Sequence, residues 1–135
     1  MWSFKKDKRK EIWDEAIQWP IGDIEAADKI RNICRSAADS AERIGGRAGP
    51  LGGKKAKPGG QQNECDAERY ECAARAAMEI AMKVSDDLMR DAAVSEIVEL
   101  CVKANHMKTA RILFRAIQAA SIRERVLNEH PQLQQ

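Results

Sequence analysis

Long apolar runs are absent from this 135-residue sequence. No stretch approaches the roughly 18 consecutive apolar residues that a membrane-spanning helix needs. The charged start of the chain, Met1–Lys10, is followed by no apolar segment, so it does not have the form of a secretory signal peptide. We therefore expect a cytoplasmic location.

Aromatic residues are also scarce, and the alternation of β-branched or aromatic residues that is typical of strands is missing. Alanine is abundant from Ala67 to Ala120, and its small side chain lets helices approach closely at little cost in helix propensity. The composition predicts an all-α fold, built of helical hairpins or a bundle, without a bulky aromatic core. Four of the six aromatic residues lie in the first 19 positions: Trp2, Phe4, Trp13 and Trp19.

Glycine is almost confined to one segment. Seven of the eight glycines and two of the four prolines lie between positions 45 and 60, where Leu51 is the single large apolar residue. Such a segment cannot bury enough surface to offset the entropy that it would lose on ordering. We predict a flexible basic linker, rich in Gly, Pro and Lys, over Gly45–Gln62.

The linker separates two helical blocks. We expect a helical pair with a basic aromatic start in residues 1–44, a repeat-like helical block in residues 63–130 and a tail in residues 131–135. In the first block, the apolar spacing predicts helices over Lys5–Trp19 and Ile24–Ile44. Pro20 ends the first of these helices, and Gly45 and Gly46 close the second.

Turn residues divide the second block into shorter helices. Ser85, Asp86 and Asp87 form the turn and cap between the first two of them. Ser121 and Glu124 have the spacing of a capping box, which predicts that the last helix opens there. The expected helices are Asn63–Val84, Leu88–Asn105, Met107–Ala119 and a short one that stops before Pro131.

Residues in catalytic or metal-binding patterns are missing. His106 and His130 have no second ligand at metal spacing, and no CxxC or HExxH motif is present. A phosphate-binding loop is excluded, because Ala48 stands where that motif needs glycine and Lys55 where it needs serine or threonine. No serine lies in a nucleophile-elbow sequence. We therefore expect no metal, no cofactor and no enzymatic activity.

The cysteines are even in number, but nothing in the sequence indicates secretion. Cys65 and Cys72, placed on one helix, would have Cα atoms about 10 Å apart, which is beyond the reach of a disulfide. We predict reduced, buried thiols that act as small apolar side chains. The four are Cys34, Cys65, Cys72 and Cys101.

The second block matches itself at an offset of 33 residues. Each half has an apolar helix, a short polar turn and a new helix that opens with an apolar residue and an arginine. A period in the thirties is typical of helix–turn–helix arrays, in which each pair of helices buries its face against a neighbour. The matched positions are Ala77 with Ala110, Val84 with Ile117, Met89 and Arg90 with Ile122 and Arg123, and Val94 with Leu127.

The segment Ile97–Ile117 resembles a tetratricopeptide repeat. After a helix and a tight turn, its second helix carries Ala110, Phe114 and Ile117 at the family's small, aromatic and apolar positions. The resemblance covers about residues 77–127 and at most one and a half repeats. It implies a scaffold that presents a concave helical surface to a peptide or a partner protein.

The region of resemblance departs from the family at three positions. Val98, Cys101 and Ile122 replace the family's usual glycine, tyrosine and proline. Any antiparallel helical hairpin also gives a match of this kind, and this alternative stays open.

Positive charge is concentrated outside the predicted helical body. Residues 5–10 carry a net charge of +4 and the linker another +4, which leaves about −6 on the rest of a chain whose net charge is +2. Basic segments on an acidic body can contact an acidic protein surface or a polyanion. The candidate contact residues are Trp2, Phe4, Lys5, Lys6, Lys8, Arg9, Lys10, Lys54, Lys55 and Lys57.

The repeat and the missing catalytic patterns favour a non-enzymatic cytoplasmic module, an adaptor or regulator, that binds another protein of unknown identity. Because the core is small, self-association is expected as well. The second hypothesis is a peripheral membrane protein anchored by Met1–Trp19, whose aromatic residues flank lysines. Core packing is nevertheless the preferred role of Trp13 and Trp19. Nonspecific nucleic-acid binding ranks third, because the acidic body would repel phosphates.

Overall fold

The chain forms a set of packed α-helices in a computed structural model that describes residues 11–14, 17, 19–48 and 60–134, without the side chains of residues 47–48 and 60–64. Within these ranges there are five α-helices and no strand, so the predicted all-α fold is confirmed. Two short 3-10 helices accompany them. The elements are η2 (Ile12–Asp14), α1 (Asp23–Ala48), α3 (Gly60–Ala81), α4 (Asp87–Lys103), α5 (Met107–Ala116), α6 (Ala120–Glu129) and η4 (Pro131–Gln134).

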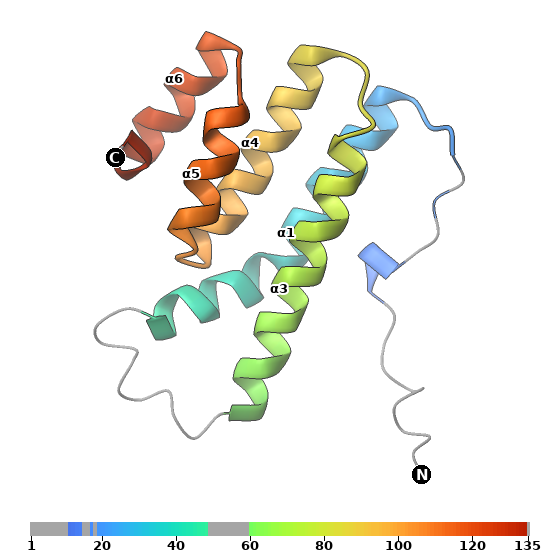
Figure 1. The fold of residues 1–135 in the computed structure, drawn as a ribbon. Coiled ribbons are helices and arrows are strands. Elements are labelled where there is room, and N and C mark those ends of the chain that lie inside the picture. The colour runs from blue at the N-terminus through green and yellow to red at the C-terminus, as the bar shows by residue number, and fades with distance from the viewer. Residues whose placement is uncertain (1–10, 15–16, 18, 49–59, 135) are drawn as a thin grey trace.

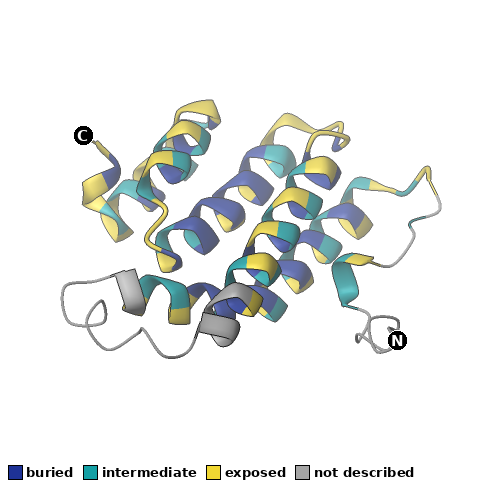
Figure 2. Cartoon of the chain, turned by 60° about the horizontal axis from the view of Figure 1, so that its bottom comes forward, coloured by how far each residue is buried: buried dark blue, intermediate teal, exposed yellow. Residues whose placement is uncertain are grey.

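Helix α1 joins the two blocks that the sequence separates. It lies against both α3 and α4, and α4 in turn lies against α5 and α6 (Figure 1). Figure 2 shows the buried residues on the helix faces that are turned toward neighbouring helices, with exposed residues on the outer faces. One continuous core therefore runs from α1 to α6, and its fully buried side chains include Ile30, Ile97, Leu100, Ile117 and Val126.

The apolar stripe of α1 forms as predicted, but the helix does not end at its two glycines. It continues through Gly45 and Gly46 to Ala48. A Cβ atom on Gly45 would overlap the backbone carbonyl oxygen of Lys103, whereas nothing lies within 4 Å of one on Gly46. Glycine at position 45 therefore lets α1 approach the end of α4 closely. This role in tertiary packing replaces the role of helix cap that the sequence predicted.

The predicted linker is shorter at both ends than Gly45–Gln62. Residues 45–48 belong to α1 and residues 60–62 to α3. The interior of the segment, residues 49–59, lies outside the described residues, so its flexibility stays a prediction.

The helix predicted over Lys5–Trp19 is not found in the part of it that the structure describes. Ile12–Asp14 is a single 3-10 turn, and neither Ile17 nor Trp19 is helical. Glu11 binds an arginine of α3, and the apolar residues Ile12 and Ile17 pack against the core. These tertiary contacts override the local helical spacing.

The turn between α3 and α4 is built as predicted around Asp86, whose carboxylate accepts a hydrogen bond from the amide of Met89 at 2.8 Å. A second carboxylate, on Asp23 at the start of α1, accepts the amides of Ser85 and Asp86 at 3.0 and 2.9 Å. These two bonds lower the pKa of Asp23. They fasten the beginning of α1 to the α3–α4 turn.

The capping box predicted for Ser121 and Glu124 is not present at the turn between α5 and α6. Ser121 lies inside α6, whose N-cap is Ala119, and no side chain of the cap residue bonds there. Instead, the buried carboxylate of Asp91 in α4 accepts the amides of Gln118 and Ala119 at 3.1 and 2.9 Å. Because these amides are held outside a helix, α5 ends at Ala116 and does not reach Ala119.

The C-terminal segment is part of the folded body. Helix α6 ends at Glu129, before Pro131, as the sequence predicts. The following turn, η4, lies against α5 and α6, and the side chain of Leu133 is buried. The predicted tail therefore closes this end of the core.

The contact at Gly45 gives a test of the packing of α1 on α4. Gly45→Ala is expected to lower the free energy of unfolding by roughly 1–3 kcal/mol, because the added Cβ overlaps the Lys103 carbonyl. Gly46→Ala is expected to raise it by about 0.5–1 kcal/mol, the usual gain of alanine over glycine inside a helix. Urea unfolding followed by circular dichroism measures both changes. Equal effects of the two substitutions would contradict the close contact.

The bonds of Asp23 make stability depend on pH. Because the pKa of Asp23 is lowered in the folded state, its contribution is complete above the ordinary value of 3.8 and is lost as pH falls through the lowered value. Asp23→Ala is therefore expected to lower the melting temperature at pH 7, and the difference from the wild type should decrease as pH falls below 3.8. Asp28→Ala, an exposed acid on the same helix, is the control. An Asp23→Ala deficit that did not change with pH would refute this assignment.

Candidate ligand-binding pocket

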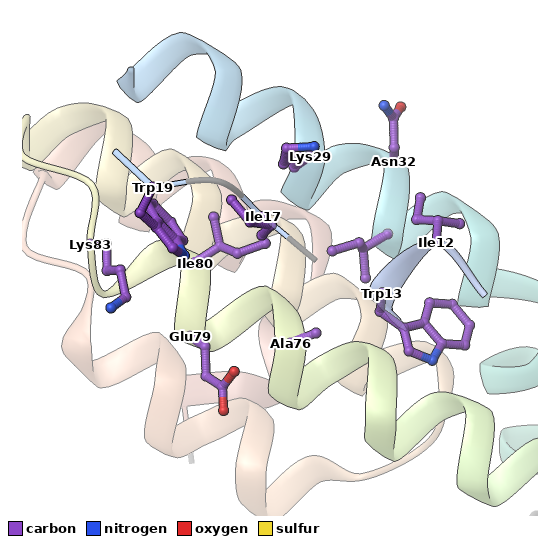
Figure 3. Close-up of a pocket in the computed structure, with 11 residues that line it drawn as sticks. Ile12, Trp13, Ile17, Trp19, Lys29, Asn32, Ala76, Glu79, Ile80 and Lys83 are labelled. Carbon is purple, nitrogen blue, oxygen red and sulfur yellow. The ribbon is translucent and has the colours of Figure 1, made fainter. Parts of the chain in front are cut away.

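A hollow lies between α1, α3 and the segment that precedes α1. We name this segment the N-terminal strap, meaning the described residues 11–14, 17 and 19–21. The pocket has a volume of about 500 Å³, within the range of small-ligand and side-chain sites. Its lining residues are Ile12, Trp13, Ile17, Trp19, Lys29, Asn32, Ile33, Ala76, Glu79, Ile80 and Lys83 (Figure 3).

The helical walls of the pocket follow from residue spacing. Lys29, Asn32 and Ile33 share one face of α1 because they are three and four residues apart. Positions 76, 79, 80 and 83 follow the same rule along α3 and its end. Figure 3 shows Ile17 of the strap next to Ile80, with Trp19 and Trp13 toward opposite ends of the pocket.

Arg69 of α3 fastens the strap to the helices. Its guanidinium donates two hydrogen bonds to the Glu11 carboxylate, at 2.9 and 3.1 Å, and a third to the buried Ser40 hydroxyl of α1 at 2.7 Å. The guanidinium also lies 5.1 Å from the centre of the Trp13 ring. The bonds to Glu11 raise the pKa of Arg69 further above its ordinary value. One side chain thus joins the strap, α1 and α3.

The other end of the pocket is more open. The ammonium of Lys83 lies 5.2 Å from the centre of the Trp19 ring, and 41% of Trp19 is exposed. Trp13 is half-buried and packs against the core. The expected packing role of the two tryptophans is therefore fulfilled by Trp13, on the strap, whereas Trp19 stands at the mouth of the pocket.

The chemistry of the lining is that of a binding site. Seven of the eleven lining residues are apolar, and the other four are two lysines, a glutamate and an asparagine, so the lining is amphipathic. Among the described lining residues there is no cysteine, histidine, serine or aspartate to act as a nucleophile or as one of a catalytic pair. Such a pocket suits apolar side chains or an apolar ligand, with an acidic group near Lys29 and Lys83.

The reactive groups that the sequence singled out lie elsewhere. Burial raises the pKa of Cys34 to about 12 and also raises that of Cys101, so both thiols stay protonated at neutral pH and are poor nucleophiles. The Tyr70 hydroxyl forms a hydrogen bond with Nδ1 of His106 at 2.9 Å, and burial raises the pKa of Tyr70. All four cysteines are free. Burial of the thiols was predicted correctly for Cys34 and Cys101, but Cys65 is exposed.

The structure does not test the predicted contact residues. All ten of them, at positions 2–10 and 54–57, lie outside the described residues. The sequence reasoning missed Lys29, Glu79 and Lys83, which no motif marks. The available signal was that each follows the helical spacing of the apolar stripe beside it, so that charge lies at the edge of an apolar groove.

Comparison with known proteins adds no family. No protein-family model, no curated protein and no solved structure matches the chain. Among the described residues, every helix is too short or too polar to cross a lipid bilayer.

The role of Glu11 gives a test of how the strap is held. Glu11→Gln is expected to weaken the attachment by roughly 1–2 kcal/mol, because a neutral amide replaces a carboxylate that accepts two bonds from a guanidinium. In a Trp2→Phe, Trp19→Phe background, Trp13 fluorescence should then be quenched more strongly by acrylamide. Glu25→Gln, at an exposed acid of α1, is the control and should leave quenching unchanged. Equal quenching of Glu11→Gln and the wild type would contradict this attachment.

Proposed function

We propose that the chain is a non-enzymatic cytoplasmic helical module, an adaptor or regulator, that binds a segment of a partner protein in the pocket between α1, α3 and the N-terminal strap. The observation that carries the proposal is the pocket itself. It combines a volume of about 500 Å³ with seven apolar lining residues and three charged ones. Apolar pockets with a few polar groups at the edge are typical of sites for the anchor residues of a peptide.

The contacts of the strap support a partner segment that is not helical. Ile12, Trp13 and Ile17 belong to a stretch whose described residues form no α-helix, and all three pack against the core. The groove between α1 and α3 thus accommodates aliphatic and aromatic side chains of a non-helical segment. A partner segment with similar side chains would occupy the adjoining hollow by the same contacts.

The rim supplies selectivity by charge. The charged lining residues are two lysines, Lys29 and Lys83, and one acid, Glu79, so the rim has a net positive charge. Acidic residues beside an apolar anchor would complement the lysines, which favours association and correct orientation. The partner segment is therefore acidic and amphipathic.

The expected helical repeat is part of this proposal, and contacts at the offset of 33 residues support it. Arg90 donates to the carbonyl of Val84 at 3.4 Å, and Arg123 donates to that of Ile117 at 2.9 Å. Helices α4 and α6 begin 33 residues apart, at positions 87 and 120. An array of the tetratricopeptide type would present its helical grooves to partner peptides in the same manner.

Selection from a random peptide library against the full chain tests the proposal. The enriched peptides should carry an aliphatic or aromatic residue next to Asp or Glu, and their binding should change the fluorescence of Trp13 or Trp19. Ala76→Trp, which fills the pocket, is expected to weaken binding at least about tenfold, since each 1.4 kcal/mol is a factor of ten.

The matched control is Ala92→Trp, which adds the same ring at an exposed position of α4. It should bind the selected peptides like the wild type, and circular dichroism should show that both variants are folded. The proposal is wrong if no peptide is enriched, or if Ala76→Trp and Ala92→Trp bind equally well.

A further inference from the structure

Three side chains of metal-binding type converge where α6 ends beside α4. They are Glu99 of α4, Glu129 at the last position of α6, and His130 directly after it. One ligand atom from each lies within 4.8 Å of the other two. Glu99 and His130 are half-buried and Glu129 is exposed, so an ion can enter from solvent. None of the three lines the proposed peptide pocket.

The backbone on both sides of His130 is fixed by hydrogen bonds. The amide of His130 donates to the carbonyl of Val126 at 2.8 Å, and the amide of Leu133 donates to the carbonyl of His130 at 3.0 Å. Val126 and Leu133 are themselves buried in the core. The fold therefore fixes the backbone of His130, which lowers the entropy cost of assembling a site.

The charges at this place favour a cation. The carboxyl groups of Glu99 and Glu129 lie close together, and Lys103 of α4 is the nearby basic group. Two carboxylates side by side repel each other unless a proton or a cation neutralises them.

We propose that Glu99, Glu129 and His130 form a binding site for a divalent transition-metal ion, with Zn²⁺ as the best match. Two carboxylate oxygens and one imidazole nitrogen suit zinc, whereas calcium and magnesium prefer oxygen ligands alone. With ligand bonds of about 2.0–2.2 Å, a tetrahedral site needs ligand atoms about 3.4 Å apart. Rotation of the exposed Glu129 side chain brings the ligands to this spacing and leaves the fourth position to water.

The role of such an ion would be to join α6 to α4. These helices already meet through Val126 in the core, and the ion would add a bond between them at the surface, near the C-terminal turn η4. No local motif marks this site, because Glu99 and Glu129 are 30 residues apart in the sequence and lie on two different helices. The site and the peptide pocket are independent, so either can fail without the other.

Zinc titration of the full chain tests this site. The protein is stripped with a chelator and carries Cys65→Ser and Cys72→Ser, which remove the two thiols that are not buried. We expect one Zn²⁺ per chain by calorimetry, and a melting temperature that rises with the zinc concentration. Cobalt bound in place of zinc should give the visible absorption of a site with nitrogen and oxygen ligands.

Two variants and one matched control assign the ligands. Glu99→Gln and His130→Gln are each expected to weaken zinc binding at least about tenfold, because each removes one of three protein ligands. Glu99→Gln also removes the repulsion with Glu129, so it should remain folded. The control is His106→Gln, at the other histidine of the chain, which should bind zinc like the parent. The proposal is overturned by absence of binding at millimolar zinc, or by binding that survives both ligand substitutions.

Discussion

Helix α1 meets α3 and α4 through alanines, and this close approach determines what else the chain can build. Ala37 and Ala41 of α1 and Ala73 and Ala77 of α3 have no exposed surface. Small side chains allow the helix axes to come near each other, and the many weak contacts of a dense interior then stabilise the pair. At Gly45 the helix backbones are so close that even the methyl group of alanine would overlap the carbonyl of Lys103. The groove that holds the strap exists because α1 and α3 are held in this way.

Two aspartates act at turns, where backbone amides would otherwise lack partners. Asp23 and Asp91 each accept two amides from a turn that belongs to other helices. A carboxylate that receives two amides satisfies both and connects distant parts of the chain. The turns of this protein are therefore set by the neighbouring helices as much as by their own residues.

The parts of the fold that the sequence predicted well depend on local chemistry. The apolar stripe of α1, the cap at Asp86 and the end of α6 before Pro131 are all encoded within a few residues. The errors share one physical cause, which is competition from distant groups. Arg69 binds Glu11 at a separation of 58 residues, and Asp91 captures the amides near Ser121 from another helix.

The candidate sites follow the same division. Trp13 and Trp19 are notable in the sequence because aromatic residues are rare in the chain, and both line the pocket. Lys29 and Lys83 are not notable in the sequence, because a lysine is ordinarily a solvated charge unless the fold places it beside a pocket. Glu99 and His130 are neighbours only through the packing of α6 on α4. Sites of this kind require the tertiary structure.

The attachment of the strap also has a consequence for motion. Helix α1 buries an apolar face along its length, whereas the start of the strap is attached through the Glu11–Arg69 ion pair and partly buried side chains. Local opening of a segment with few buried contacts costs less free energy than global unfolding. Release of the strap with the helices still folded therefore requires less free energy than unfolding of α1, so the pocket can open without loss of the core.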